Sequence, residues 1–195
     1  MTRRTQAERS DTTTSQLISA ARKLFGEYGY AATSIDAVAA TAGVTKGAAY
    51  HHFAGKPGLF RAAFTREQEE IATRLEEVGA ASPDPWTALR DGCRTFLEHC
   101  LDPGFRRIVL LDAPSVLGWE EVRQIQHAHT LRVLLNAMRA TDETLPADTL
   151  AIRGQLMFGA LCEAGMLLAR SPDPTAALPP ITIQADHLLT ALHTP

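Results

Sequence analysis

Apolar residues recur at three- and four-residue steps along nearly the whole chain, which is the spacing of one face of an α-helix. Near the N-terminus, Leu17, Ala21, Leu24 and Tyr28 fall on one such stripe. Alternation with a period of two, which is typical of a strand, never persists. With 195 residues, 45% of them apolar, the chain has enough material for a core. The spacing therefore predicts an all-α protein.

Capping residues, glycines and prolines predict where the helices begin and end. Thr13, Thr33 and Thr45 are suited to N-caps, and Gly29 and Gly43 are suited to the turn that ends a helix. Pro114 is expected to stop a short apolar helix that precedes it. The predicted helices cover residues 15–28, 34–41, 45–53, 57–78, 86–101, 105–111, 120–140, 147–169 and 183–192.

Positive charge is concentrated at the N-terminal end. Residues 1–66 carry nine Lys and Arg against four Asp and Glu, although the whole chain has 19 against 22 and a net charge of −3. A basic end on an acidic remainder favours contact with a polyanion at that end. Arg3, Arg4 and Arg9 form a basic tail, which is either solvated or an arm for a minor groove.

Residues 34–53 have the length and glycine placement of a helix-turn-helix, with Ala42-Gly43-Val44 as the turn. Ala49 and Phe53 are expected to pack beneath the second helix. Its predicted exposed side is short, polar and nearly free of carboxylates, as an approach to phosphates requires. The side consists of Thr45, Lys46, Gly47, Ala48, Tyr50 and His51.

Four residues of this side are candidate DNA contacts. Lys46 lies in the first helical turn, where its ammonium can meet a phosphate or a guanine edge. Tyr50 can aim its hydroxyl at a phosphate, His51 faces the groove, and Gly47 has no side chain to hold the helix away from the bases. The alternatives are a solvated lysine at 46 and a half-buried core ring at 50.

Three further residues are candidates for phosphate contacts that set the register without reading sequence, namely Thr33, Thr45 and Lys56. For both threonines, helix capping explains the residue type equally well.

The run from Tyr30 to Lys56 contains Ala-Gly-Val-Thr-Lys-Gly and Tyr-His-His-Phe at fixed offsets, and it resembles the DNA-binding signature of TetR-family transcriptional regulators. The resemblance covers about the first sixty residues, with Ala49 where the family usually has leucine. We accordingly expect an N-terminal three-helix DNA-binding module with a helix-turn-helix over residues 1–56. The fourth helix would fuse it to a helical effector-binding and dimerisation body over residues 57–195.

The resemblance also implies a homodimer that pairs the helices near 147–169 and 183–192. The first of these helices has Gly154, Gly159 and Gly165 among leucines, so it is apolar around much of its circumference. The alternative is a central core helix of a monomer.

A small-molecule cavity in the body is expected to be mostly apolar with a few polar anchors. Its candidate lining residues are Phe96, Cys100, Phe105, Leu110, Leu111, Trp119, His127, Phe158, Cys162 and Glu163. His127 and Glu163 are the polar candidates, and most of the set is expected to be plain core. No metal site or cofactor is expected, and Cys93, Cys100 and Cys162 are expected to be reduced thiols.

Together these features predict a cytoplasmic, ligand-responsive regulator that binds a double-stranded DNA operator. It would be a repressor released by a small apolar effector, with no membrane span. One alternative is a DNA-binding regulator that responds to a protein partner. The other is an enzyme housed in the helical body, although no nucleophile, phosphate loop or paired carboxylates support it.

Overall fold

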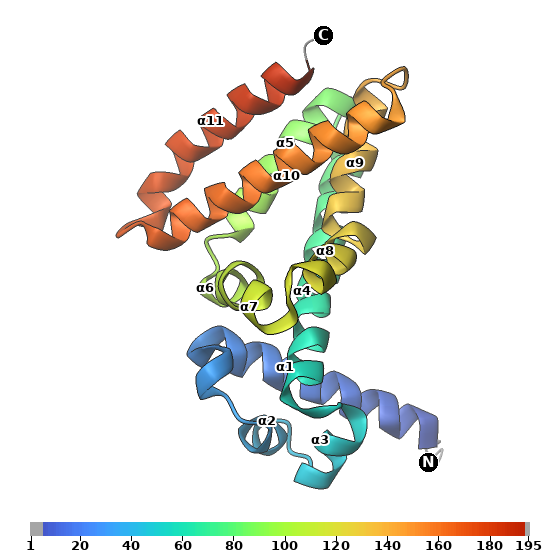
Figure 1. Ribbon diagram of the computed structural model, residues 1–195, viewed down its shortest axis with the longest axis vertical. Coiled ribbons are helices and arrows are strands. Elements are labelled where there is room, and N and C mark those ends of the chain that lie inside the picture. The colour runs from blue at the N-terminus through green and yellow to red at the C-terminus, as the bar shows by residue number, and fades with distance from the viewer. Residues whose placement is uncertain (1–5, 194–195) are drawn as a thin grey trace.

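The computed structural model describes residues 6–193, and every regular element in this range is a helix, so the all-α prediction is confirmed. Figure 1 shows a small head at one end, made of α1–α3, and a larger body at the other, with α4 running from the head into the body. The helices are α1 (Gln6–Ala32), α2 (Ile35–Thr41), α3 (Lys46–His52), α4 (Gly55–Ala81), α5 (Pro85–His99), α6 (Pro103–Phe105), the π-helical η1 (Arg106–Asp112), α7 (Ala113–Leu117), α8 (Trp119–Ala128), α9 (Thr130–Thr141), α10 (Ala147–Arg170) and α11 (Pro174–His193).

The head packs around the apolar stripe of α1. Leu17, Ala21 and Phe25 on this stripe are fully buried. The ring of Phe60, from the first turns of α4, meets those of Phe25 and Tyr30 edge to face, with centroids 5.1 and 5.2 Å apart. Because Phe60 belongs to α4, the core of the head includes the helix that leads into the body.

A charged cluster joins α1 to α4 above this core. Arg22 donates from Nε to Glu67 at 2.8 Å and from its two terminal nitrogens to Glu70 at 2.6 Å each. Desolvation lowers the pKa of Arg22, but the hydrogen bonds to the two carboxylates outweigh it and the net shift is upward. Glu67 is buried, so its charge depends on Arg22 for compensation.

The end of α1 is also held by the segment that contains α6 and η1. A Cβ added at Gly26 would lie 2.9 Å from the Cα of Gly104, so the two backbones approach as closely as only glycines permit. The backbone N–H of Tyr30 donates to the Asp112 carboxylate at 2.8 Å. The head is therefore fastened to the body on two sides.

The start of α1 and the cap of α2 differ from the sequence prediction. Thr13 is not an N-cap, because α1 already begins at Gln6 and the threonines lie within it. Gly29 has the expected positive φ, 81°, but it forms a kink after which α1 continues to Ala32. The N-cap of α2 is Ser34, whose Oγ accepts from the N–H of Ala37, and not Thr33.

Proline did not stop the helix at 105–111. The backbone continues from α6 through η1 into α7, which ends at Leu117. Pro114 lies in the first turn of α7, directly after the π-helical turn. In the first turn of a helix the backbone N–H is not required for an intrahelical hydrogen bond. A proline there, which lacks this N–H, therefore does not interrupt the helix.

Two other helix limits are corrected in the body. The predicted helix 120–140 is divided into α8 and α9 at His129, whose φ of −125° and ψ of −98° are not helical. The last helix is longer than 183–192, because α11 begins at Pro174 and contains Pro179 and Pro180. Packing of its residues Ala177, Leu178 and Ile181 on the core compensates for the lost N–H donors.

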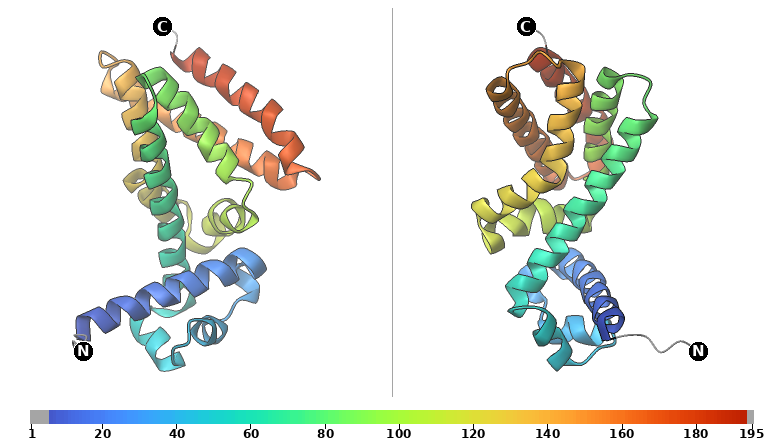
Figure 2. Two further views of the ribbon diagram at one scale, coloured as in Figure 1. Left: turned by 180° about the vertical axis from the view of Figure 1, so that it is seen from behind. Right: turned by 90° about the vertical axis from the view of Figure 1, so that its right-hand side faces the viewer.

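The last two long helices, α10 and α11, lie side by side, and both views in Figure 2 agree with this arrangement. The inner face of α10 is buried, with Met157, Phe158 and Leu168 in the core. The outer faces carry exposed large apolar side chains, which we call the outer apolar face: Ile152, Leu156, Leu167, Ile183 and Leu188. None of the described helices is both long and apolar enough to span a membrane.

Replacing Arg22 by Ala should lower the free energy of unfolding by about 2–3 kcal/mol, because the buried Glu67 loses its hydrogen-bonded counter-charge. Urea unfolding followed by circular dichroism measures this change. Arg66→Ala is the control, since Arg66 pairs with Glu69 at 3.5 Å on the surface and should cost less than about 0.5 kcal/mol. Equal losses in the two variants would contradict the role given to Arg22.

Candidate nucleic-acid interface and body cavity

The helix-turn-helix forms from α2, the turn 42–45 and α3. Gly43 has a φ of +69°, which lets the chain reverse where a residue with a Cβ would be strained. Thr45 caps α3 by accepting the N–H of Ala48 at 3.2 Å. Ala49 is buried against the core while the opposite side of α3 faces solvent. The expected start, turn and buried side of α3 are therefore present.

Lys46 and Tyr50 lie one turn apart on the exposed side of α3. The Lys46 ammonium pairs with the Asp36 carboxylate on α2 at 2.7 Å, and both side chains are more than half exposed. It also lies 5.8 Å from the centroid of the Tyr50 ring. The hydrogen bond to Asp36 raises the pKa of Lys46, so the residue stays cationic at neutral pH. Such an exposed pair is weak, and a DNA phosphate can replace Asp36 as the partner of Lys46.

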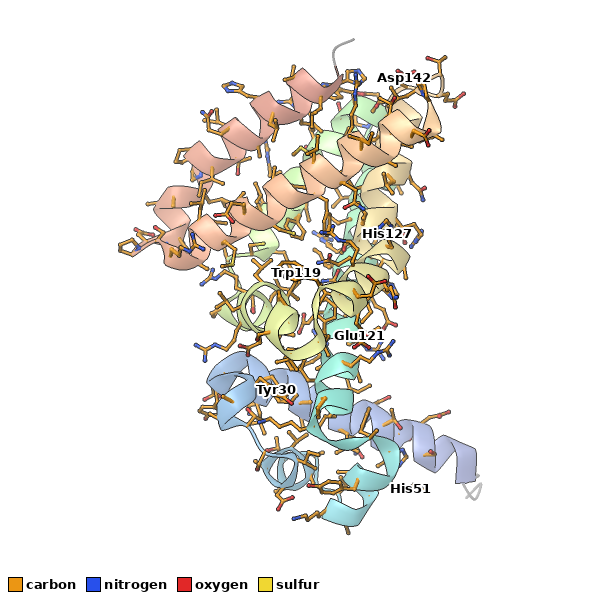
Figure 3. All side chains as sticks on the ribbon, viewed as in Figure 1. Tyr30, His51, Trp119, Glu121, His127 and Asp142 are labelled. Atoms are coloured by element: carbon orange, nitrogen blue, oxygen red, sulfur yellow. The ribbon has the colours of Figure 1, made fainter. Side chains whose placement is uncertain are left out.

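The two histidines at the end of α3 are placed differently. His51 is exposed, and Figure 3 shows it on α3 at the end of the head remote from the body. His52 is partly buried, and its Nδ1 lies 3.1 Å from the hydroxyl oxygen of Thr14 on α1. His51 is thus free to meet a partner in solution, whereas His52 ties α3 to α1.

Thr33, Tyr50 and Lys56 line one shallow recess where α1 ends and α4 begins. The buried Thr33 hydroxyl donates to the carbonyls of Gly29 and Leu24, so it is used inside the head. Lys56 donates to the carbonyl of Ala31 at 3.2 Å, and its ammonium lies 4.3 Å from the centroid of the Tyr30 ring. Both residues therefore have a structural function beside any contact with DNA.

Gly47 has open space around it, because a Cβ built there would meet no heavy atom within 4 Å. In the free protein nothing in the head requires glycine at this position. The glycine leaves the α3 backbone accessible from solvent at this position. The side chains of the basic tail, Arg3, Arg4 and Arg9, lie outside the part of the chain that the structure describes.

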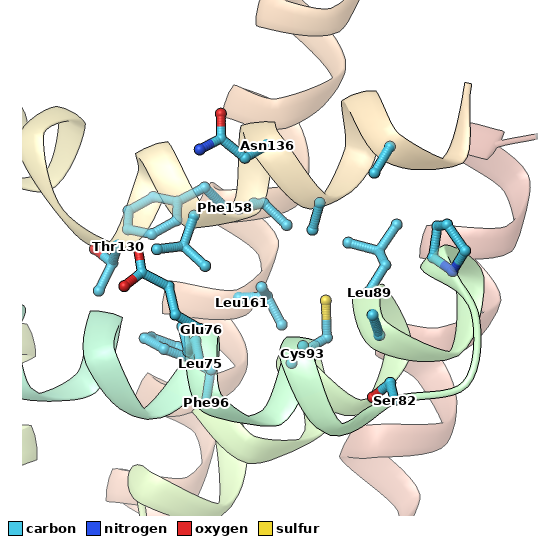
Figure 4. A pocket seen from close by; sticks show the side chains of 18 of the residues that line it. Leu75, Glu76, Ser82, Leu89, Cys93, Phe96, Thr130, Asn136, Phe158 and Leu161 are labelled. Atoms are coloured by element: carbon cyan, nitrogen blue, oxygen red, sulfur yellow. The ribbon is translucent and has the colours of Figure 1, made fainter. Parts of the chain in front are cut away.

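The body contains an apolar cavity of about 450 Å³ that is partly open to solvent and is lined by the C-terminal half of α4, the turn 82–84, α5, α9 and α10 (Figure 4). This volume lies in the range of small-molecule sites. Leucines and phenylalanines form much of the wall, and the space between them stays open because several lining residues are small. The small residues are Gly79, Ala88, Gly92, Ala137 and Ala140.

Two of the predicted lining residues, Phe96 and Phe158, line this cavity. The other predicted residues do not, and four of them belong to the core around it. Cys100 and Phe105 are buried, while Leu110 and Cys162 are partly buried and pack against the core. Leu110 and Cys100 meet α10 at Gly165, where an added Cβ would lie 2.8 and 3.0 Å from their side chains.

The remaining predicted residues face solvent. Leu111 and Trp119 are 47% and 68% exposed. His127 is exposed, with its Nε2 2.9 Å from the amide nitrogen of Gln155, and Glu163 points to Arg170 at 3.6 Å. Trp119 and His127 belong to α8, which the unpredicted break at His129 separates from α9, and it is α9 that lines the cavity.

The cavity residues that sequence reasoning missed come from all four helices of the lining and from the turn between α4 and α5, and those of α4 and α9 include most of the polar ones. Leu75, Glu76 and Gly79 line it from α4, and Thr130 and Asn136 from α9. A run of small residues in both helices was the available signal, but it cannot show which helices face each other.

The three cysteines are buried or partly buried in the core. Burial raises the pKa of the Cys93, Cys100 and Cys162 thiols to about 12, which keeps them protonated. All three are free thiols. Within residues 6–193, no three His, Cys, Asp or Glu side chains come together as a metal site.

An exposed helix-turn-helix on a helical body with an internal cavity defines a DNA-binding regulator, and comparisons with known proteins agree. Residues 17–63 match the bacterial regulatory proteins of the tetR family, and residues 86–192 match the tetracyclin repressor-like C-terminal domain. The chain belongs to the TetR family, whose members are DNA-binding regulators and not enzymes.

Individual relatives support this assignment. The chain is 30% identical over 172 residues to the transcriptional repressor Rv1474c of Mycobacterium tuberculosis, covering 82% of this chain and 83% of the repressor. It is 32% identical over 124 residues to the TetC protein of transposon Tn10 from Escherichia coli, covering 62% of this chain and 60% of TetC. A TetR-family regulator from Pectobacterium atrosepticum superposes with a TM-score of 0.77 at 36% identity, covering 97% of both chains.

Gly43 and Gly47 should respond in opposite ways to substitution by Ala. Gly43→Ala should lower the free energy of unfolding by about 1 kcal/mol, because the positive φ is strained with a Cβ. Gly47→Ala should raise it by up to about 1 kcal/mol through better helix propensity in open space. Thermal unfolding of both variants measures this, and destabilisation by Gly47→Ala would contradict the placement of Gly47.

Proposed function

We propose that this chain is a cytoplasmic, dimeric transcriptional repressor that leaves its DNA operator when a small apolar effector fills the body cavity. The observation that carries the proposal is the exposed side of α3, where a lysine, a tyrosine and a histidine project beside an unobstructed glycine. Such a helix fits the major groove of B-DNA.

The proposed DNA contacts follow from the placement of the side chains. Lys46 exchanges Asp36 for a phosphate or a guanine edge, and Tyr50 offers its hydroxyl to the backbone. His51 faces the base edges, with Gly47 allowing the close approach. Thr45 and Lys56 lie at the margins and serve as phosphate contacts. We leave Thr33 out of the set, because its hydroxyl is buried and bonded to carbonyls of α1.

TetR-family proteins act as dimers, and we propose that this one pairs through α10 and α11. The outer apolar face supports this choice. Ile152, Leu156 and Leu167 project from α10 at helical spacing, and Ile183 and Leu188 continue the surface on α11. An apolar patch of this kind marks an interaction site, and a twofold axis would bury it in both copies. The dimer places two α3 helices for successive major grooves, about 34 Å apart.

The path from cavity to DNA is proposed to run along α4. Its C-terminal half lines the cavity through Leu75, Glu76 and Gly79, and its N-terminal half belongs to the head through Phe60 and Glu67. An effector that binds better to a dimer with a different head separation would shift the population away from the operator-binding state.

The regulator that responds to a protein partner is the second candidate. The mostly apolar lining with a few polar groups favours the small-molecule effector, because this is the usual make-up of a small-molecule site.

Lys46→Ala and Tyr50→Ala should each weaken binding to the operator by about tenfold or more, because they remove contacts to the groove and backbone. Footprinting on the DNA that flanks its own gene supplies the operator, and gel shifts measure the affinity. Circular dichroism checks that the variants stay folded. Arg74→Ala, on the exposed body part of α4, is the control and should leave affinity unchanged. Wild-type affinity in both head variants would contradict the proposal.

Leu156→Asp should raise the dimer dissociation constant by about 100-fold, because each dimer would bury two new charges. Sedimentation analysis at micromolar concentration measures the change. Leu156→Met keeps the apolar surface and should remain dimeric. An unchanged dimer dissociation constant for Leu156→Asp would contradict an interface on α10.

A further inference from the structure

The charged residues that line the body cavity are all acidic. Glu76 on α4 and Asp84 before α5 carry carboxylates, and neither Lys, Arg nor His lines it within the described residues. The other polar lining residues are Ser82, Thr130 and Asn136. The lining therefore offers a ligand two carboxylates and no cationic side chain, while Arg132, the ion-pair partner of Glu76, lies outside the lining.

The hydroxyl donors of the lining are already used by the protein. Thr130 donates to Oε1 of Gln68 at 2.5 Å, and Ser82 donates to the carbonyl of Val78 at 2.9 Å. Cys93 offers only a weakly donating thiol, and burial keeps it protonated. Asn136 is the remaining strong donor of the lining, and it is exposed. The interior wall thus has little with which to bind an anion.

The carboxylate oxygens of the lining, which are its charged hydrogen-bond acceptors, differ in how far the protein already uses them. Both oxygens of Asp84 accept from Thr87, one from the backbone N–H and one from the hydroxyl, and these bonds lower the pKa of Asp84. Glu76 accepts from Arg132 through Oε1 at 2.8 Å, and no bond of Oε2 is found in the described part of the chain. Figure 4 shows the Glu76 carboxylate beside Thr130 and Phe158 in the cavity. Glu76 therefore has an acceptor oxygen available to a ligand.

We infer that the body cavity selects an apolar molecule that carries a hydroxyl or ammonium donor for Glu76, and that it rejects carboxylates of the same shape. This inference rests on the proposed function of the cavity as the effector site. The apolar part of such a ligand gains binding free energy when it is buried against the leucine and phenylalanine side chains of the cavity wall. A carboxylate would lose part of its hydration next to two like charges, and Arg132 is already paired with Glu76 outside the lining, whereas a donor would gain a charge-assisted hydrogen bond.

Three probes with one shared body test the selectivity: 4-phenyl-1-butanol, 4-phenylbutylamine and 4-phenylbutanoate. Isothermal titration of the full chain at pH 7.5, without DNA, measures each dissociation constant. The alcohol and the amine should each bind at least about tenfold more tightly than the carboxylate, which corresponds to about 1.4 kcal/mol.

Variants assign the effect to the cavity and to Glu76. Gly92→Leu fills the cavity from α5, where the glycine has open space at its Cβ position, and should weaken all the probes that bind. Glu76→Gln should reduce the ratio of carboxylate to amine dissociation constants at least threefold. Glu77→Gln is the matched control, because Glu77 is the next residue of α4, pairs with Arg74 and does not line the cavity.

Carboxylate binding as tight as that of the alcohol would overturn the inference, and so would failure of all three probes to bind. An equal effect of Glu76→Gln and Glu77→Gln would overturn the role of Glu76. None of these results depends on DNA, whereas the failure of the proposed function would appear as a wild-type chain that binds no operator.

Discussion

The structure depends on one helix being shared by two cores. The N-terminal turns of α4 complete the aromatic cluster of the head through Phe60, and its later turns form a wall of the body. The Arg22 cluster fixes the rotation of α4 relative to α1, because Glu67 is buried and its charge needs that partner. A change at the body end of α4 is therefore a change in the position of the head.

A second connection restrains the same head from the opposite side. Gly26 on α1 touches Gly104 beside η1, and Asp112 binds the backbone of Tyr30. A π-helical turn is an uncommon way to continue a helix, and here it lies at the junction of head and body. With α4 on one side and η1 on the other, the head is positioned by the packing of the body and not by a flexible linker.

Local signals predicted the head well and the body less well. Thr45 and Gly43 act within a few residues of themselves, so the cap and turn of the helix-turn-helix could be derived from the sequence. Pro114 and the pair Pro179 and Pro180 are strong breakers locally, yet Pro114 is accommodated in the first turn of α7, and packing of α11 on the core compensates for the donors missing at Pro179 and Pro180. Where local preference and burial disagree, only the three-dimensional contacts decide.

By itself the sequence determined the helical class, the basic N-terminal end and the exposed side of α3, because each follows from the residues of one segment. The tertiary structure alone decided which residues enclose the cavity. Phe96 and Phe158 were found from composition, whereas Glu76, Thr130 and Asn136 became lining residues only through the break at His129 and the packing of α9 on α4 and α5. A cavity is a relation between helices distant in sequence, and periodicity within one helix does not contain it.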